Sequence, residues 1–320
     1  MPRGGIVASL VVATRGRESL LARLLESISH LDPSAIQVVV VDQNLDDRVT
    51  RLLAAGGIEV LHVRVPWANA SRARNLGAAL ARGRWIAFPD DDCWARSDTL
   101  PGLLAAIGYA EQVGATVVTG PIRDEHGEPH MRRWAATSRS LTVADIRECA
   151  IEATTVVRRE EFLAVGGFDP RFGPGARFHA AEGDELLVRL DRAQQGWSGW
   201  YDTGFSFGHP RRVAGTDRAS VRRTFRYAIG AGAAWGRHPR SALAGSTGYA
   251  IVESLGALLL RRPRPWLVAD RLARAAGILV GAVLGVFTFH RPRERQERRR
   301  LQHLLHEDLR EARVREWQRE

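Results

Sequence analysis

The first 120 residues alternate between short apolar runs and longer segments in which apolar residues recur every three or four positions. Patterns of the first kind indicate buried strands, and patterns of the second kind indicate amphipathic helices. Regular alternation of the two is typical of an α/β protein with a doubly wound, mostly parallel sheet. We expect strands at 6–13, 37–41, 58–63, 84–88 and 115–119, and helices at 19–29, 47–55, 71–81 and 99–110.

The alternation stops near Gly120. Glycine, proline and charged residues dominate the segment up to Ser140, which predicts a long functional loop. After Arg212 the pattern is helical throughout, and these changes divide the chain into regions 1–120, 121–212 and 213–320. In the second and third regions we expect strands at 153–158 and, as a pair, within 199–207, and helices at 160–165, 184–194, 217–235, 241–260, 266–289 and 294–320.

The net charge of +10 suits an anionic substrate, an anionic lipid surface or nucleic acid. Every basic residue is arginine, which is more typical of genomic base composition than of selection for one partner, and the signatures of nucleic-acid recognition are missing. We therefore expect no nucleic-acid partner. Cys93 and Cys149 stand far apart without CxxC spacing, which argues against a disulfide framework or structural zinc and favours a reducing cytosol. The apolar run 6–13 is too short for a signal peptide.

Three aspartates, Asp90, Asp91 and Asp92, directly follow the predicted strand 84–88. In open α/β sheets, ligands bind at the carboxyl ends of the strands, and hard cations such as Mg²⁺ take carboxylate oxygens together with substrate phosphates. The run therefore indicates a metal-diphosphate site. The alternative is a solvated turn that caps the next helix, because aspartate is a good N-cap residue.

Polar residues also follow the other early strands. Thr14, Arg15 and Arg17 come after the first strand, and Asp42 ends the second. The segment 71–77, with two arginines and an asparagine, opens the helix before the aspartates. A carboxylate can accept hydrogen bonds from a nucleobase or ribose, while arginines and a helix N-terminus can neutralise a diphosphate. Each of these residues alone fits a turn or a solvated surface, but four such clusters at consecutive strand ends favour a common ligand.

The motifs resemble, in order and spacing, those of the family 2 glycosyltransferases, inverting enzymes with the GT-A fold. The resemblance covers about residues 5–212 and is carried by segments 11–17, 40–44, 73–77, 88–92, 166–169 and 172–175. It implies that a nucleotide-sugar donor binds at Thr14, Arg15, Arg17, Asp42, Arg74, Asn75, Asp90 and Asp91. Asp42 matches the position that binds the base. Asp90 and Asp92 match the outer members of the DXD motif, with Asp92 as a ligand of Mn²⁺ or Mg²⁺.

The catalytic base is where the chain departs from the family. The gapless match to the family's Gly-Glu-Asp-x-Asp/Glu-Leu motif is 181–186, and it puts Gly183 at the base position. An inverting transfer needs a carboxylate that takes the proton of the acceptor hydroxyl. We favour Asp184, followed by Glu182, and also consider Glu185. The alternative is that these acids only cap a helix and that the enzyme is weak or inactive.

His209 follows this motif by an interval at which related enzymes often carry a histidine near the metal. Its imidazole could complete the coordination beside Asp92 and Asp90, or it could be structural.

We therefore expect a metal-dependent inverting glycosyltransferase whose acceptor is a cell-envelope or lipid-linked glycan. Region 1–120 would be the nucleotide-sugar-binding half of the GT-A domain, and 121–212 the acceptor and catalytic half. A nucleotidyltransferase and an inactive membrane-bound scaffold are the rival functions.

Region 213–320 holds two apolar helical segments, and we expect it to attach peripherally to the cytoplasmic side of the cell membrane. A soluble helical subdomain is the alternative. The flanking arginines would suit an anionic surface: they are Arg261, Arg262, Arg264, Arg291 and Arg293. The last segment could pair with a second copy through leucines at helical spacing, namely Leu301, Leu304, Leu305 and Leu309.

Overall fold

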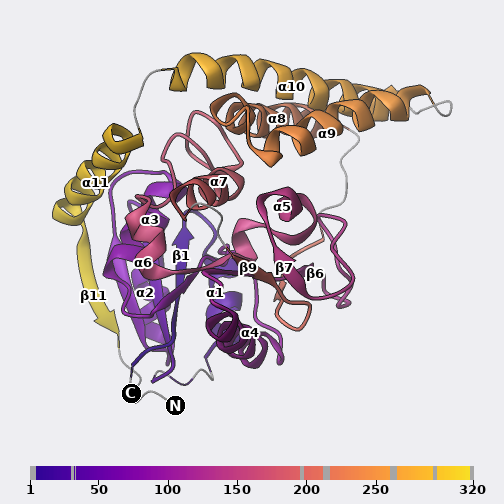
Figure 1. Ribbon diagram of the computed structural model, residues 1–320. Helices are drawn as coiled ribbons and strands as arrows, with labels where there is room; N and C mark the ends of the chain where they lie inside the picture. Colours follow the sequence, from indigo (N-terminus) through magenta and orange to yellow (C-terminus); the bar gives the residue numbers. More distant parts are fainter. Residues whose placement is uncertain are drawn as a thin grey trace.

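The computed structural model describes residues 5–29, 32, 34–194, 198–211, 217–259, 265–290 and 294–317. A mixed sheet lies at the centre, with helices on both faces and a separate helical layer across one end (Figure 1). The arginines predicted to flank the apolar helices, 261, 262, 264, 291 and 293, lie outside the described residues.

The main sheet has nine strands in the order β11-β3-β2-β1-β4-β8-β5-β9-β7. The pairs β3-β2, β2-β1 and β1-β4 are parallel, as predicted. The strands are β1 (Ala8–Thr14), β2 (Ile36–Asp42), β3 (Val60–Arg64), β4 (Trp85–Ala87), β5 (Val117–Thr119), β7 (Arg139–Leu141), β8 (Val156–Arg158), β9 (Gly199–Tyr201) and β11 (Arg313–Trp317). The α/β class with a mostly parallel sheet is therefore confirmed.

Two hydrophobic cores cover the two faces of the sheet, because β1 and β2 are buried on both sides. On one face the core is formed with α1 (Glu18–Ser27), α2 (Arg48–Ala55) and α4 (Thr99–Val113). On the other face it is formed with α3 (Ala70–Leu80), α6 (Arg159–Ala164) and α7 (Glu182–Gln194).

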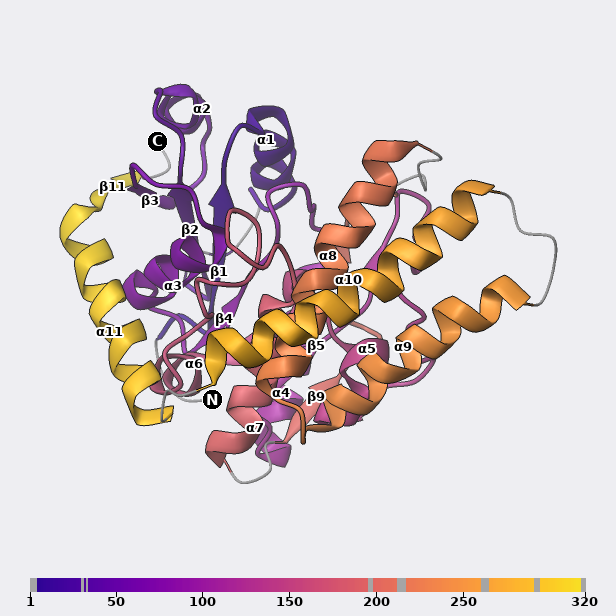
Figure 2. The same ribbon diagram turned by 90° about the horizontal axis from the view of Figure 1, so that it is seen from above.

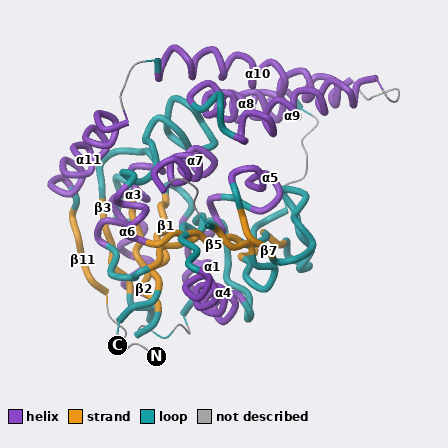
Figure 3. The backbone as a smooth tube through the Cα atoms, viewed as in Figure 1, coloured by secondary structure: helices purple, strands orange, loops and turns teal. Residues whose placement is uncertain are grey.

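The segment 120–158 is more structured than the predicted loop and strand. It contains β6 (Ile122–Arg123), β7, α5 (Ile146–Cys149) and two 3₁₀ turns, η1 (Val143–Asp145) and η2 (Glu152–Thr154). The predicted pairing of strands within 199–207 is wrong: β9 joins the main sheet, while β10 (Phe207–Gly208) pairs with β6. Both β6 and β10 have only two residues, which is too short for a periodic pattern. Loop segments, teal in Figure 3, rise between the strands and the helical layer.

The helical layer consists of α8 (Arg218–Arg237), α9 (Ala242–Leu259) and α10 (Pro265–Phe289). The helix α10 runs along α8, as the view from above also shows (Figure 2). Small residues allow this contact: a β-carbon at Gly281 would meet the carbonyl oxygen of Ile229, and one at Gly285 would meet that of Ala233. Among the described residues, α10 is the one helix whose length and apolar composition would suffice to cross a membrane.

The chain then turns down the side of the sheet as α11 (Glu294–Glu311), which packs on α3. Leu301, predicted to pair with a second copy, is instead buried against Gly166 of the same chain. The prediction of a helix throughout 294–320 is also wrong, because β11 pairs antiparallel with β3 from Arg313 to Trp317. Edge strand β3 offers unpaired backbone groups, and pairing overrides the helical pattern there.

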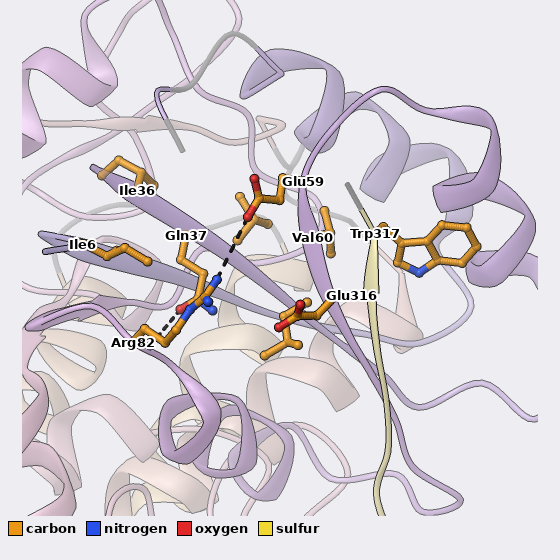
Figure 4. Close-up of a pocket in the computed structure, with 10 residues that line it drawn as sticks. Ile6, Ile36, Gln37, Glu59, Val60, Arg82, Glu316 and Trp317 are labelled. Carbon is orange, nitrogen blue, oxygen red and sulfur yellow. Dashed lines mark hydrogen bonds and ion pairs between the residues drawn. The ribbon is translucent and has the colours of Figure 1, made fainter. Parts of the chain in front are cut away.

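Next to β11, a small pocket lies at the amino ends of the strands, where Gln37 accepts a hydrogen bond from the backbone N–H of Arg82 at 2.8 Å (Figure 4). It is at the opposite end of the strands from Thr14 and Asp42.

Candidate functional site

The aspartates after β4 meet the loop after β1. The hydroxyl of Thr14 donates to Asp91 at 2.9 Å, and the guanidinium of Arg17 donates to both Asp91 and Asp92 at 2.9 Å. Asp91 and Asp92 are buried, while Arg17 is half exposed. Burial raises the pKa of Asp91, although Arg17 and Thr14 oppose this effect. The predicted donor residues Thr14, Arg17 and Asp91 thus form one cluster with Asp92.

His209 joins this cluster from a distant part of the chain. Two backbone hydrogen bonds between Trp94 and Gly208 hold the segment beside the aspartates. His209 is buried, with Nδ1 2.9 Å from the carbonyl oxygen of Pro210 and Nε2 3.3 Å from Asp92 Oδ1. If Nδ1 donates to the carbonyl, the neutral ring presents the Nε2 lone pair to the carboxylate. His209 Nε2 and Asp92 Oδ1 would then both present lone pairs, and a cation can be bound by both atoms.

The donor set therefore fits a divalent cation that takes its other ligands from a diphosphate and water. In the part of the chain that the structure describes, no group of three or more His, Cys, Asp or Glu side chains is arranged to hold a metal ion by itself. The third predicted metal ligand, Asp90, instead pairs with Arg74.

Arg74 lies at the centre of a second cluster. Its Nη2 is 2.5 Å from Asp90 and its Nη1 is 2.9 Å from Glu182, the first residue of α7. Arg74 and Glu182 are both buried, and Glu182 Oε2 has no hydrogen-bond partner among the described residues. Gly173, with φ of 93°, allows its loop to approach, because a β-carbon there would lie 2.9 Å from the Glu182 carboxyl carbon. Burial raises the pKa of Glu182, although Arg74 opposes this effect.

Sequence reasoning missed Glu152, which belongs to this second cluster. Its carboxylate lies beside Gly183: a β-carbon built at Gly183 would be 3.1 Å from Glu152 Oε2. Burial, together with the charges of Glu182 and Asp90, raises the pKa of Glu152 to about 8. The one signal in the sequence was the acidic residue itself. It interrupts a run of apolar and small residues, 150–153, directly before the predicted strand 153–158.

The predicted base candidates Asp184 and Glu185 face different surroundings. Asp184 is mostly buried, with a carboxylate oxygen 3.7 Å from Arg132. Glu185 is fully buried and contacts Arg189, Arg237 and His238 at 2.8 to 3.2 Å. Although burial alone would raise it, Arg189 and Arg237 hold the pKa of Glu185 well below its usual range. Glu185 thus joins α8 to α7, and so strongly paired a carboxylate is a poor proton acceptor; its role as a base stays a prediction.

Three predicted donor residues are engaged differently from the expectation. Asp42 is fully buried; it accepts hydrogen bonds from the backbone and side chain of Asn44 and lies 3.2 Å from His62 Nε2. Asn75 clamps the backbone of Phe168, donating to its carbonyl and accepting from its N–H, both at 2.8 Å. Arg15 is exposed at the rim. Direct contact of these three residues with a nucleotide stays a prediction.

Comparison with known proteins identifies similar sequences for the first half of the chain. Residues 9–160 match the profile of the family described as glycosyl transferase family 2. The chain is 31% identical over 142 residues to the succinoglycan biosynthesis protein ExoM of Rhizobium meliloti (strain 1021), which covers 42% of this chain and 44% of that protein. It is 34% identical over 113 residues to ExoO of the same organism, covering 34% and 31%. The matches thus span about half or less of these relatives' length.

Solved structures with the same fold extend the likeness beyond the matched segment. The mannosyltransferase PcManGT from Pyrobaculum calidifontis, in complex with GDP-Man and Mn²⁺, superposes with a TM-score of 0.57 at 15% identity, covering 96% of this chain and 86% of that one. S. aureus TarS 1–349 in complex with UDP-GlcNAc gives a TM-score of 0.51 at 13% identity, covering 87% and 91%. The predicted resemblance to the family 2 glycosyltransferases is therefore confirmed over residues 9–160, the segment that matches the family.

Proposed function

We propose that this protein is a metal-dependent, inverting glycosyltransferase that moves a sugar from a nucleoside-diphosphate sugar to a hydroxyl acceptor. The observation that carries the proposal is the junction of two clusters at one edge of the sheet. Asp91 and Asp92, with Arg17 and His209, suit a metal and a diphosphate, while Arg74 links Asp90 to Glu182 on the acceptor side. The family and the nucleotide sugars in the two solved relatives support it.

Asp92 and His209 are the residues that would hold the metal. When bound, a divalent cation stabilises the negative charge that develops on the leaving diphosphate. Arg17 is half exposed, and it neutralises Asp91 and Asp92 when no ligand is bound. Its guanidinium can turn to the phosphate oxygens when the donor arrives, because guanidinium groups bind phosphate bidentately. Asp92 is then available to the metal.

The acceptor of the proposed reaction is a cell-envelope or lipid-linked glycan, reached from the cytoplasmic face of the membrane. An exposed apolar stripe on α10 supports this part of the proposal: Leu279, Val283 and Phe287 follow at every fourth position and are 52%, 56% and 78% exposed. The opposite face of α10 packs on α8 through its glycines. Such a two-faced helix suits a position in the plane of the membrane surface. The names of ExoM and ExoO, succinoglycan biosynthesis proteins, agree with an envelope glycan.

Release of free nucleotide from a panel of UDP- and GDP-sugars, measured with Mn²⁺, Mg²⁺ or EDTA, tests the reaction. We expect release with at least one donor, its loss in EDTA, and a reduction of about 100-fold or more in Asp92→Ala. Asp98→Ala is the matched control, because this aspartate is 63% exposed on its side chain and lies six positions further along.

Three results would contradict the proposal. Release of pyrophosphate would indicate a nucleotidyltransferase. Calorimetric binding of a nucleotide sugar without turnover under any condition would indicate a scaffold. Turnover that is equal in Asp92→Ala and the unaltered chain would place the metal elsewhere.

A further inference from the structure

Gly183 has no conformational reason to be glycine. It is the second residue of α7 and has ordinary helical backbone angles rather than the left-handed conformation that favours glycine. Within a helix, glycine costs about 1 kcal/mol relative to alanine. Space is the remaining reason, because a β-carbon at 183 would lie 3.1 Å from Oε2 and 3.2 Å from Cβ of Glu152. The side chain of Glu152 fills the volume into which residue 183 would extend.

Glu152 reaches this place from the main sheet. It begins η2, directly before β8, and β8 lies between β4 and β5 in the sheet. Two side-chain hydrogen bonds hold η2 in place. The Thr154 hydroxyl donates to the carbonyl oxygen of Gly120 at 2.6 Å, and the Thr155 hydroxyl donates to the carbonyl oxygen of Ile151 at 2.7 Å. The backbone that carries Glu152 is therefore rigid, as positioning of a reactive carboxylate requires.

The charged groups around Glu152 are Glu182 from α7, Asp90 from the end of β4 and Arg74 from α3. Arg74 bonds to Asp90 and Glu182 and is thereby committed to both. The other acids near the start of α7 are also engaged, Asp184 with Arg132 and Glu185 with three basic side chains. Burial and two like charges disfavour the carboxylate form of Glu152, so its affinity for a proton is raised.

We propose that Glu152 is the general base of the transfer and supplies, from another part of the same chain, the carboxylate that Gly183 lacks. This rests on the proposed function. The acceptor oxygen attacks the anomeric carbon while its proton passes to a Glu152 carboxylate oxygen. The bond between that carbon and the diphosphate oxygen breaks, its electron pair leaves with the nucleoside diphosphate, and the configuration inverts. Glu152 then returns the proton to water.

An exchange of the two positions tests the assignment. The variants are Glu152→Ala, Gly183→Asp and the double variant Glu152→Ala/Gly183→Asp, assayed with the donor that the unaltered chain turns over. Glu148→Ala is the matched control, because Glu148 lies four positions earlier and its side chain is 66% exposed. Donor affinity is measured by calorimetry in every variant, so that loss of binding is separated from loss of turnover.

We expect Glu152→Ala to lower kcat by about 100-fold or more, the usual size of a general-base contribution. Donor affinity should stay within about threefold of the unaltered chain. The double variant should recover at least about tenfold of the lost kcat, whereas Gly183→Asp alone is slower than the unaltered chain because two carboxylates compete for one space. The acid limb of the kcat profile, along which kcat falls as Glu152 takes up a proton, is expected near pH 8 in the unaltered chain and should move in the double variant.

Two results would overturn the assignment of Glu152 alone. One is near-normal kcat in Glu152→Ala, and the other is a folded, donor-binding double variant that recovers nothing. The absence of turnover in the unaltered chain with every donor would instead overturn the proposed function itself, and the base with it.

Discussion

The two charged partners of Arg74 come from parts of the chain that are about 90 positions apart. Arg74 contacts Asp90, at the end of β4, and Glu182, at the start of α7. Burying a charged group without an opposite charge costs free energy, so Arg74 and these two acids stabilise one another. The helix α3 thereby joins the end of β4 to the start of α7, the proposed donor and acceptor sides of the site. Burial lowers the pKa of Arg74 in itself, but the charges of Asp90 and Glu182 raise it overall.

A dependence of stability on pH follows from Glu152. Its pKa is raised from the ordinary value of 4.5 to about 8 in the folded chain, so between these values the native state binds a proton that the unfolded state has lost. The corresponding stability is complete below pH 4.5 and is lost as the pH rises through 8. We expect Glu152→Gln, which cannot ionise, to remove this loss.

Urea unfolding at pH 5, 7 and 9 would check this expectation. Between pH 5 and 9, the difference in free energy of unfolding between Glu152→Gln and the unaltered chain should change by on the order of a few kcal/mol in favour of the variant. Equal pH dependence of the two proteins would show that Glu152 ionises normally.

At the scale of single residues, the sequence predicted which residues lie close together but not all of their partners. Thr14, Arg17, Asp91 and Asp92 end adjacent parallel strands, so their meeting follows from strand direction. The contact of Asn75 with Phe168 and of Glu152 with Gly183 depends on how loops fold back, and no local pattern records that. A charged residue in an apolar run is equally compatible with an exposed strand position.

Between α8 and α10, the glycines bring two backbones into direct contact. Gly281 and Gly285 on α10 face the backbone of Ile229 and Ala233 on α8, while Gly232 and Gly236 on α8 face the backbone of α10 at Ile278 and Ala282. Small residues at every fourth position let helices approach closely and pack along their whole length. Each position has backbone rather than flexible side chain opposite it, so a larger residue cannot be accommodated by a change of rotamer.

Gly281→Leu should therefore destabilise the helical layer by about 1–3 kcal/mol, the usual cost of overpacking. Gly248→Leu on α9 is the control, because nothing lies within 4 Å of a β-carbon there. Thermal unfolding followed by circular dichroism should show a fall of several degrees for the first variant and none for the second. A Tm for Gly281→Leu equal to that of the unaltered chain would mean that α8 and α10 are not in contact.

At the level of elements, long periodic segments were predictable and short ones were not. The helices α8, α9 and α10 have 20, 18 and 25 residues, and each was expected within three residues of its bounds. Strand β8 has three residues and runs antiparallel to β4 and β5, which a pattern of alternating strands and helices does not reveal. Tertiary pairing decides such short strands.

Across the whole molecule, the helical layer lies over the carboxyl ends of the strands (Figures 1 and 2). The helix α10, which carries the proposed membrane face, thus lies at the same end of the sheet as the two charged clusters. The proposed membrane-bound acceptor would approach the protein at this end.

A variant with Leu279→Glu, Val283→Glu and Phe287→Glu tests the membrane face. Each of these side chains would contribute about 1.5–3 kcal/mol if fully buried in lipid, so binding to vesicles of anionic phospholipid should fall by at least about tenfold. Val113→Glu is the control, since Val113 is 47% exposed at the end of α4. Flotation of both variants with such vesicles measures the bound fraction. Unchanged flotation of the triple variant would place the contact with the membrane elsewhere or exclude it.

Ion pairs hold α11 against the rest of the molecule. Glu297 contacts Arg171 and Arg237, and Asp308 contacts Arg72, so the segment after the helical layer is fixed at both ends. Buried or half-buried pairs of this kind fix geometry more than they add stability.

The pairing of β11 with β3 has a consequence for biosynthesis. The two strands are about 250 positions apart, so the ribosome works for roughly 10 to 50 seconds between them. During this interval the backbone of β3 has no neighbour on its outer side, and a second nascent chain can pair with it. The fold is thus most exposed to aggregation before it is complete, and a chaperone that covers the outer edge of β3 would increase the yield of soluble protein.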